Sequence, residues 1–225
     1  MSWLYKLERR YRNFGVPNLM MYIIASMAVV FLMQTLMGMP VSSWIAFNRT
    51  LVLQGEIWRI FTFTFMPPGN NIFFTIIALY FYYFVGSSLE NSWGTFRFTV
   101  YYLLGVAGAI IGGLISGFID NTYLNFSLFF AFAMLFPNNQ ILLFFVIPVK
   151  VKYIAFAVAV FFGISLLGAL TDGNIPMASS IAFSFLNFFL FFGGDIMKQM
   201  RQNAKYSKRR RDFKQNMHNN NNMWR

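Results

Sequence analysis

Residues Phe98 to Ile119 read FTVYYLLGVAGAIIGGLISGFI, an uncharged stretch that decides the fold class. As a helix rising about 1.5 Å per residue, it is long enough to cross a hydrocarbon core about 30 Å thick. Four further apolar stretches have comparable lengths, at residues 19–37, 72–88, 153–170 and 175–196. The sequence therefore predicts an all-α integral membrane protein.

The overall composition agrees with these stretches. Of the 225 residues, 57% are apolar and 11% are charged, whereas soluble domains are about 45–50% apolar and 25% charged. A bilayer allows the excess apolar side chains to face outwards. Cysteine is absent, which excludes disulfides, thiolate metal sites and cysteine nucleophiles. The only histidine is His218, so a site with two imidazoles is excluded, and we expect neither a metal nor a cofactor.

Two apolar segments are too short to cross in the usual way. Residues 123–136 would form a helix of about 21 Å, so we expect its N-terminus to begin inside the membrane, beside a polar cavity. Residues 141–147 stop at Pro148, and we interpret them as an interfacial or re-entrant segment. Counting the short helix, the sequence predicts six spans.

The distribution of charge predicts the orientation. The 18 basic residues exceed the 7 acidic ones, and the net charge of +11 would suit nucleic acid binding if it were spread over a soluble surface. With six spans and both termini in the cytoplasm, only Arg49 and Arg59 lie outside, and the other basic residues lie inside. We therefore expect a multi-pass protein with cytoplasmic termini, in the plasma membrane if the source is bacterial.

This topology divides the chain into three parts. Residues 1–18 form a basic cytoplasmic segment, residues 19–197 form the membrane domain, and residues 198–225 form a basic, Asn-rich tail that we expect to be disordered. The tail is suited to contact with anionic lipid, and alternatively to binding ribosomal RNA or an acidic partner.

The segment between the first two spans contains many apolar residues but is too polar to cross. We interpret it as an outer loop partly embedded in the membrane interface, where Trp58 is of the expected anchor type. Arg59 is positioned to donate hydrogen bonds to backbone carbonyls of this loop. The alternative is an ordinary interfacial loop.

Glycines mark two further features. Residues 86–94 read GSSLENSWG and predict a tight turn on the inner side, in which Glu90 caps the backbone or pairs with Arg97. Two glycine pairs at helix-packing spacing follow in the third span, Gly108 with Gly112 and Gly113 with Gly117.

Together these motifs resemble those of the rhomboid superfamily of intramembrane serine proteases. The loop motif is Gly55-x-x-Trp58-Arg59, and the turn motif is Gly86-x-x-Leu89-Glu90-x-x-Trp93-Gly94. Phe136-Pro137-Asn138 and residues 147–150 resemble the segment that joins the fourth and fifth helices of the family. The resemblance spans residues 19–197. It implies a six-helix bundle with an interfacial outer loop and a short fourth helix rising into a water-filled cavity.

The catalytic residues of that family are missing. Active rhomboids use a Ser in a G-x-S-G motif on the fourth helix and a His on the sixth. Here the first region reads Asn125-Phe126-Ser127-Leu128, and no span contains a His. A serine hydroxyl is a weak nucleophile without a base, and His218 lies beyond the last span. We therefore expect no enzyme activity, as in the derlins and other rhomboid pseudoproteases.

The resemblance implies that such a protein binds membrane-protein clients without cleaving them. The candidate client groove lies between the fourth and sixth helices, and the alternative is hydrogen bonding within a sealed bundle. Its candidate residues are Asn125, Ser127, Ser180, Ser184 and Asn187. Two other functions remain open: an intramembrane serine protease using Ser127, and an insertase-like protein with a ribosome-binding tail.

Overall fold

The structure is a computed structural model, and it describes residues 9, 14–119, 121–143, 147–174, 178–179, 181–182 and 186–194. The chain divides into two compact units, Met1–Phe188 and Phe189–Arg225. All of the elements below belong to the first unit. Within the second, residues 189–194 are helical.

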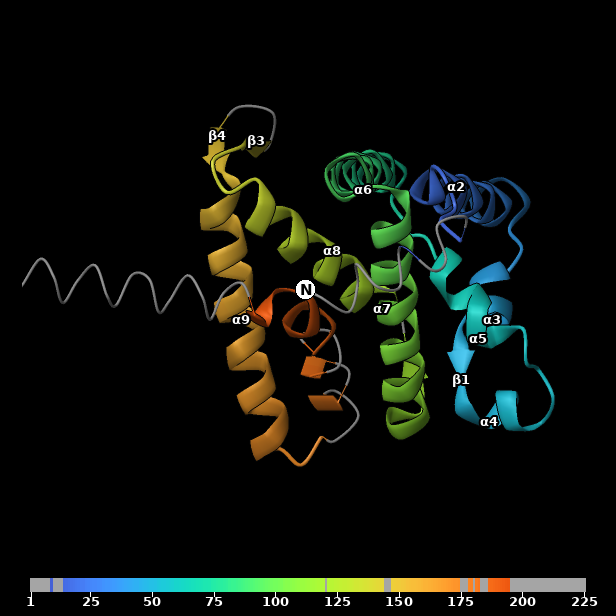
Figure 1. The fold of residues 1–225 in the computed structure, drawn as a ribbon. Helices are drawn as coiled ribbons and strands as arrows, with labels where there is room; N and C mark the ends of the chain where they lie inside the picture. Colours follow the sequence, from blue (N-terminus) through green and yellow to red (C-terminus); the bar gives the residue numbers. More distant parts are fainter. Residues whose placement is uncertain are drawn as a thin grey trace, which may run out of the picture. The chain divides into compact units, whose positions relative to one another are not determined.

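The described residues are mainly helical (Figure 1). Four helices are long and apolar enough to cross a membrane, and none contains more than two charged residues in its most apolar window. They are α2 (Leu19–Met37), α6 (Ile72–Trp93), α7 (Thr95–Ser116) and α9 (Val151–Thr171). These helices confirm an integral membrane protein, and α2 matches the predicted first span residue for residue.

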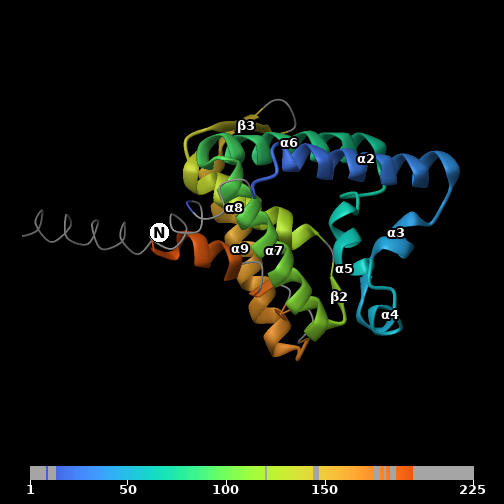
Figure 2. The ribbon, with the colours of Figure 1, turned by 45° about the vertical axis from the view of Figure 1, so that its right-hand side comes forward.

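The six-helix bundle predicted from the sequence is only partly present. The short fourth helix is α8 (Thr122–Leu135), close to the predicted residues 123–136. Helices α2 and α6 run side by side and cross α7 steeply (Figures 1 and 2). Much of the predicted sixth span, residues 175–196, lies outside the described residues; residues 186–194 of it are helical.

The turn predicted for residues 86–94 is wrong, because α6 continues through Gly86 and Glu90 to Trp93. The chain reverses at Gly94 alone, whose φ of 83° suits a residue without a side chain, and α7 begins at the next residue. Gly86 serves helix packing instead. A Cβ at this position would collide with the Met20 side chain of α2.

The third span has the predicted length but begins and ends three residues earlier than predicted: α7 ends at Ser116, and Gly117 takes a positive φ of 89°. Residues Phe118–Ile119 form a strand, β2, that pairs antiparallel with β1 (Phe47–Asn48). The side chains that approach Gly113 are those of Ile119 and Phe47. The pair Gly113 and Gly117 therefore accommodates this loop pairing, and the prediction that it packs against another helix is wrong.

The outer segment between α2 and α6 folds into short helices around β1. They are α3 (Val41–Ile45), α4 (Arg49–Leu53), α5 (Arg59–Thr62) and the 3-10 helix η1 (Phe63–Phe65). The Asn48 side chain accepts hydrogen bonds from two backbone amides at the start of α4, a normal cap. The segment is thus an ordered structure.

Of the segment 141–147, predicted to be interfacial or re-entrant, the described residues 141–143 and 147 lie in two paired strands. Strand β3 (Gln140–Leu143) pairs antiparallel with β4 (Ile147–Lys150), and α9 follows directly. The hairpin explains how a short apolar segment satisfies its backbone groups without becoming a helix.

Helix α8 lies at the centre of the first unit, where it contacts α6, α7 and α9. Aromatic pairs define two of these contacts: Phe132 packs on Phe84 of α6 at 5.5 Å between ring centroids, and Phe126 packs on Phe162 of α9 at 4.8 Å. The only serine of α8 is consequently held in the interior.

Candidate functional site

Ser127 is the centre of a buried polar cluster, and its side chain is 1% exposed. The partner from α7 is Tyr101, which is also fully buried. The Tyr101 hydroxyl donates to the backbone carbonyl of Ser127 at 2.9 Å, and its oxygen lies 2.7 Å from Ser127 Oγ.

The third member of the cluster is Asn187, 3% exposed, whose Nδ2 donates to Ser127 Oγ at 3.2 Å. The Tyr101 and Ser127 hydroxyls lie at hydrogen-bonding distance, and either oxygen can be the donor. Ser127 Oγ is therefore hydrogen-bonded to a phenol and accepts a hydrogen bond from an amide. Neither partner is a base that could activate a serine at neutral pH.

Gly105 of α7 makes this arrangement possible. A Cβ at residue 105 would lie 2.5 Å from Leu124 Cδ1 and 2.9 Å from Asn187 Nδ2. Only a residue without a side chain lets α8 and Asn187 approach α7 so closely. Tyr101 and Gly105 are thus site residues that the sequence reasoning missed.

The structure does not show the predicted client groove as an open feature. Asn125 is buried like Ser127 and Asn187, with 6% exposed, but it lies about 200° around α8 from Ser127. The next turn on its own side carries Phe129, which packs on Phe81 of α6. The burial of Asn125, Ser127 and Asn187 agrees with the alternative of a sealed bundle. Ser180 and Ser184 lie outside the described residues.

Two amide atoms in this interior, Asn125 Nδ2 and Asn187 Oδ1, have no hydrogen-bond partner within the part of the chain that the structure describes. A buried unpaired polar group costs about 1–3 kcal/mol. The closed arrangement therefore keeps one free donor on one side of α8 and one free acceptor on the other.

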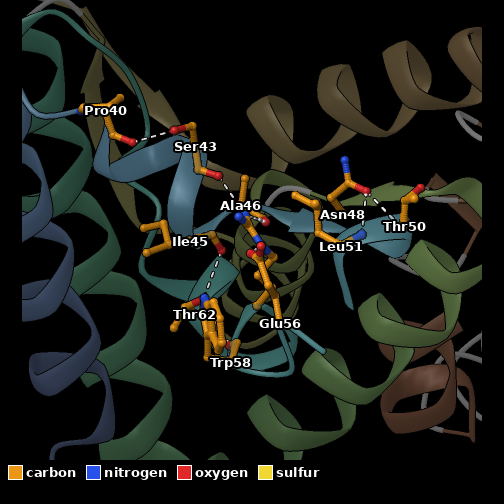
Figure 3. A network of polar contacts seen from close by, with 11 residues as sticks. Pro40, Ser43, Ile45, Ala46, Asn48, Thr50, Leu51, Glu56, Trp58 and Thr62 are labelled. Carbon is orange, nitrogen blue, oxygen red and sulfur yellow. Dashed lines mark hydrogen bonds and ion pairs between the residues drawn. The ribbon is translucent and has the colours of Figure 1, made fainter. Parts of the chain in front are cut away.

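Arg59 organises the outer segment, as predicted from the sequence. Its guanidinium is buried, with the residue 5% exposed, and Nη1 donates to the carbonyls of Ser43 at 2.7 Å and Ala46 at 2.8 Å. Its Nε pairs with Glu56 at 2.5 Å. Figure 3 shows Ser43, Ala46 and Glu56 converging from α3 and from the turn before α5.

Trp58, next to Arg59, is itself exposed, as is Trp44 on α3. The backbone carbonyl of Trp58 accepts a hydrogen bond from the Thr62 hydroxyl, which also donates to the carbonyl of Ile45 (Figure 3). Exposed tryptophans on an ordered loop agree with the predicted anchor type.

Two polar side chains attach the outer segment to the helices. Arg49 Nη1 donates to the Leu114 carbonyl near the end of α7 at 3.1 Å. Asn121, just before α8, donates through Nδ2 to the carbonyls of Thr64 and Met66 at 3.3 and 2.7 Å. The sequence reasoning assigned no role to Asn121, because its partners lie more than 50 residues away.

The turn motif, residues 86–94, holds the ends of three helices together through Glu90. Glu90 Oε1 accepts from the backbone N–H of Asn18 at 2.9 Å and from the Thr95 hydroxyl at 3.1 Å. Glu90 thus joins the start of α2 to the junction of α6 and α7. The Trp93 ring packs edge-on against the Tyr101 ring at 5.3 Å, so the motif also reaches the Ser127 cluster.

The other predicted glycine pair lies on α7. Gly112 is buried and Gly108 is half-buried. Close approach by other segments is described at two other α7 glycines, Gly105 and Gly113.

No family model matches this chain, and no curated protein matches it either. The functional argument consequently rests on the residues and their geometry.

Proposed function

We propose that this chain is a rhomboid-like, six-span membrane protein that binds segments of other membrane proteins without cleaving them. The proposal rests on the burial and hydrogen bonding of Ser127, the one candidate nucleophile. Its hydroxyl is buried and hydrogen-bonded to Tyr101 and Asn187, neither of which is a base.

A protease built on Ser127 would need a base to accept the hydroxyl proton during attack. The only histidine, His218, lies in the basic tail. Solvent and substrate would also need access to the Ser127 oxygen, and that residue is only 1% exposed. These features favour a structural hydrogen bond over catalysis.

The unpaired amide atoms favour a client with a polar group. A segment that places a hydroxyl or amide N–H against Asn187 Oδ1 would remove a cost of about 1–3 kcal/mol. Such binding requires Asn187 to separate from Ser127 on α8. The surfaces exposed by this separation are the candidate client site.

The proposed topology keeps both termini in the cytoplasm. The hydrogen bond from Asn18 to Glu90 brings the start of α2 to the end of α6, as an alternating pair of spans requires. The basic residues predicted to be cytoplasmic include Arg97 near the start of α7 and Lys150 at the start of α9.

Site-specific photocrosslinking tests client binding. A photoreactive residue replaces Asn187 in the full chain, and the matched control replaces Phe156 on α9, which is 71% exposed. We expect residue 187 to capture intact membrane proteins that residue 156 does not. Capture of lipid alone from both positions, in protein whose thermal transition is unchanged, would refute the proposal.

The insertase-like alternative depends on residues 198–225, which lie outside the described residues. It stays a prediction: deleting this tail should then abolish salt-sensitive cosedimentation with ribosomes.

A further inference from the structure

The β3–β4 hairpin has one exposed face, on which apolar side chains lie next to polar and basic ones. The register pairs Leu142 with Pro148 and Gln140 with Lys150. All four residues are exposed, and Leu142 is 56% exposed, whereas Ile141 and Val149 on the opposite face are half-buried. The alternation of a strand explains this difference between the faces.

Along the exposed face, an apolar cross-strand pair is followed by a polar and basic pair. The chain then enters α9, where Lys152 is exposed and its Nζ lies 5.1 Å above the Tyr153 ring. Apolar side chains next to lysines and a tyrosine are typical of segments that lie at a membrane interface.

The hairpin is also continuous with a surface that faces lipid. Helix α9 is one of the four helices able to cross the membrane, and its exposed apolar side chains begin within its first two turns, at Tyr153 and Phe156. Because β4 leads into α9 without a break, the hairpin lies at the N-terminal end of that helix (Figure 1).

The lysines have no acidic residue near them in the sequence, since none occurs between Asp120 and Asp172. An apolar pair next to positive charge, in a stretch of sequence without acidic residues, matches the boundary between acyl chains and anionic headgroups. A soluble acidic partner would match Lys150 and Lys152 but would leave Leu142 and Pro148 facing water.

We propose that the β3–β4 hairpin is an interfacial anchor for anionic phospholipid. Leu142 and Pro148 enter the acyl boundary, and Lys150 and Lys152 bind headgroup phosphates. This anchor is independent of client binding. Each lysine near an anionic surface favours association by about fivefold, so the two together contribute roughly 25-fold to the local partition.

The absence of cysteine allows a direct test. Leu142→Cys in the full chain carries one environment-sensitive fluorophore, and Asn138→Cys, at an exposed polar position, provides the matched control. Both are reconstituted into phosphatidylcholine vesicles with or without about one quarter phosphatidylglycerol, and quenching by lipids with nitroxide-labelled acyl chains is measured.

We expect strong quenching at residue 142 in the anionic vesicles and weak quenching at residue 138. Lys150→Gln with Lys152→Gln should more than halve the quenching at residue 142, whereas the two Lys→Arg changes should preserve it. Quenching that is equal in both vesicle types, or unchanged by the Gln substitutions, would overturn the proposal. Emission typical of water at residue 142 in both vesicles would also overturn it and would indicate a face for a soluble partner.

Discussion

Replacing Tyr101 with Phe removes a single oxygen from the centre of the buried cluster. That oxygen is hydrogen-bonded to Ser127 Oγ at 2.7 Å and lies 2.9 Å from the Ser127 carbonyl oxygen. The ring and its contact with Trp93 remain, so the change isolates the hydrogen bonds.

The expected magnitude follows from the number of bonds lost and from their surroundings. Side-chain hydrogen bonds within membrane proteins contribute about 0.6 kcal/mol on average and up to about 1.7 kcal/mol. The contacts of the Tyr101 oxygen with Ser127 Oγ and with the Ser127 carbonyl are both lost, so we expect Tyr101→Phe to lower the free energy of unfolding by about 1–2 kcal/mol.

A double-mutant cycle with Ser127→Ala separates this pair from other effects. Since Ser127→Ala removes the hydroxyl that is hydrogen-bonded to Tyr101, the second substitution should cost less once the first is present, with a coupling energy of about 1 kcal/mol. The assay is reversible unfolding of the purified chain in mixed micelles. Tyr80→Phe is the matched control, because Tyr80 on α6 is 69% exposed.

We expect no measurable change for the Tyr80 control. Additive effects of Tyr101→Phe and Ser127→Ala, with a coupling energy near zero, would refute the hydrogen-bond assignment. They would also remove the reason for considering Ser127 a structural residue.

Three further substitutions test other parts of the structure. Arg59→Lys keeps the charge but cannot reproduce the guanidinium bonds to two carbonyls and a carboxylate, so the outer segment should become several-fold more sensitive to limited proteolysis. Gly105→Ala should destabilise the chain by about 1–3 kcal/mol through overpacking, whereas Gly163→Ala on α9, where a Cβ meets nothing within 4 Å, should be neutral or slightly stabilising in the same unfolding assay. Glu90→Ala should cost about 1–2 kcal/mol through loss of the Asn18 and Thr95 bonds, and Glu90→Gln, which keeps an acceptor oxygen, should recover at least half of it.

The long apolar helices could be predicted from the sequence because crossing a bilayer is a local requirement. Length and hydropathy identify α2 and α9 almost to the residue, without knowledge of their neighbours. The role of Arg59 was predictable for a similar reason, since an arginine in a loop rich in backbone carbonyls has few other partners.

Glycine was the main source of error. A glycine can mark a turn or a close helix contact, and the sequence does not distinguish the two uses. Gly86 was interpreted as a turn residue but accommodates Met20, and Gly113 was interpreted as helix packing but accommodates a strand pair. The difference lies in residues far away in the sequence.

The buried cluster could be predicted only in part. Ser127 and Asn187 were identified as polar residues in apolar surroundings, which need partners. Tyr101 was missed, although a tyrosine inside a span also needs a partner for its hydroxyl. Its bond to Ser127 connects residues 26 positions apart on different helices, so only the fold shows which partner it takes.

The central claim is that Ser127 serves as a hydrogen-bonded structural residue of a non-cleaving membrane protein. Intact-mass measurement after treatment with a fluorophosphonate, which reacts with activated serines, tests it most directly. We expect no covalent adduct on the purified full chain, and an identical spectrum for Ser127→Ala. A stoichiometric adduct that disappears in Ser127→Ala would contradict it and would establish an active serine hydrolase.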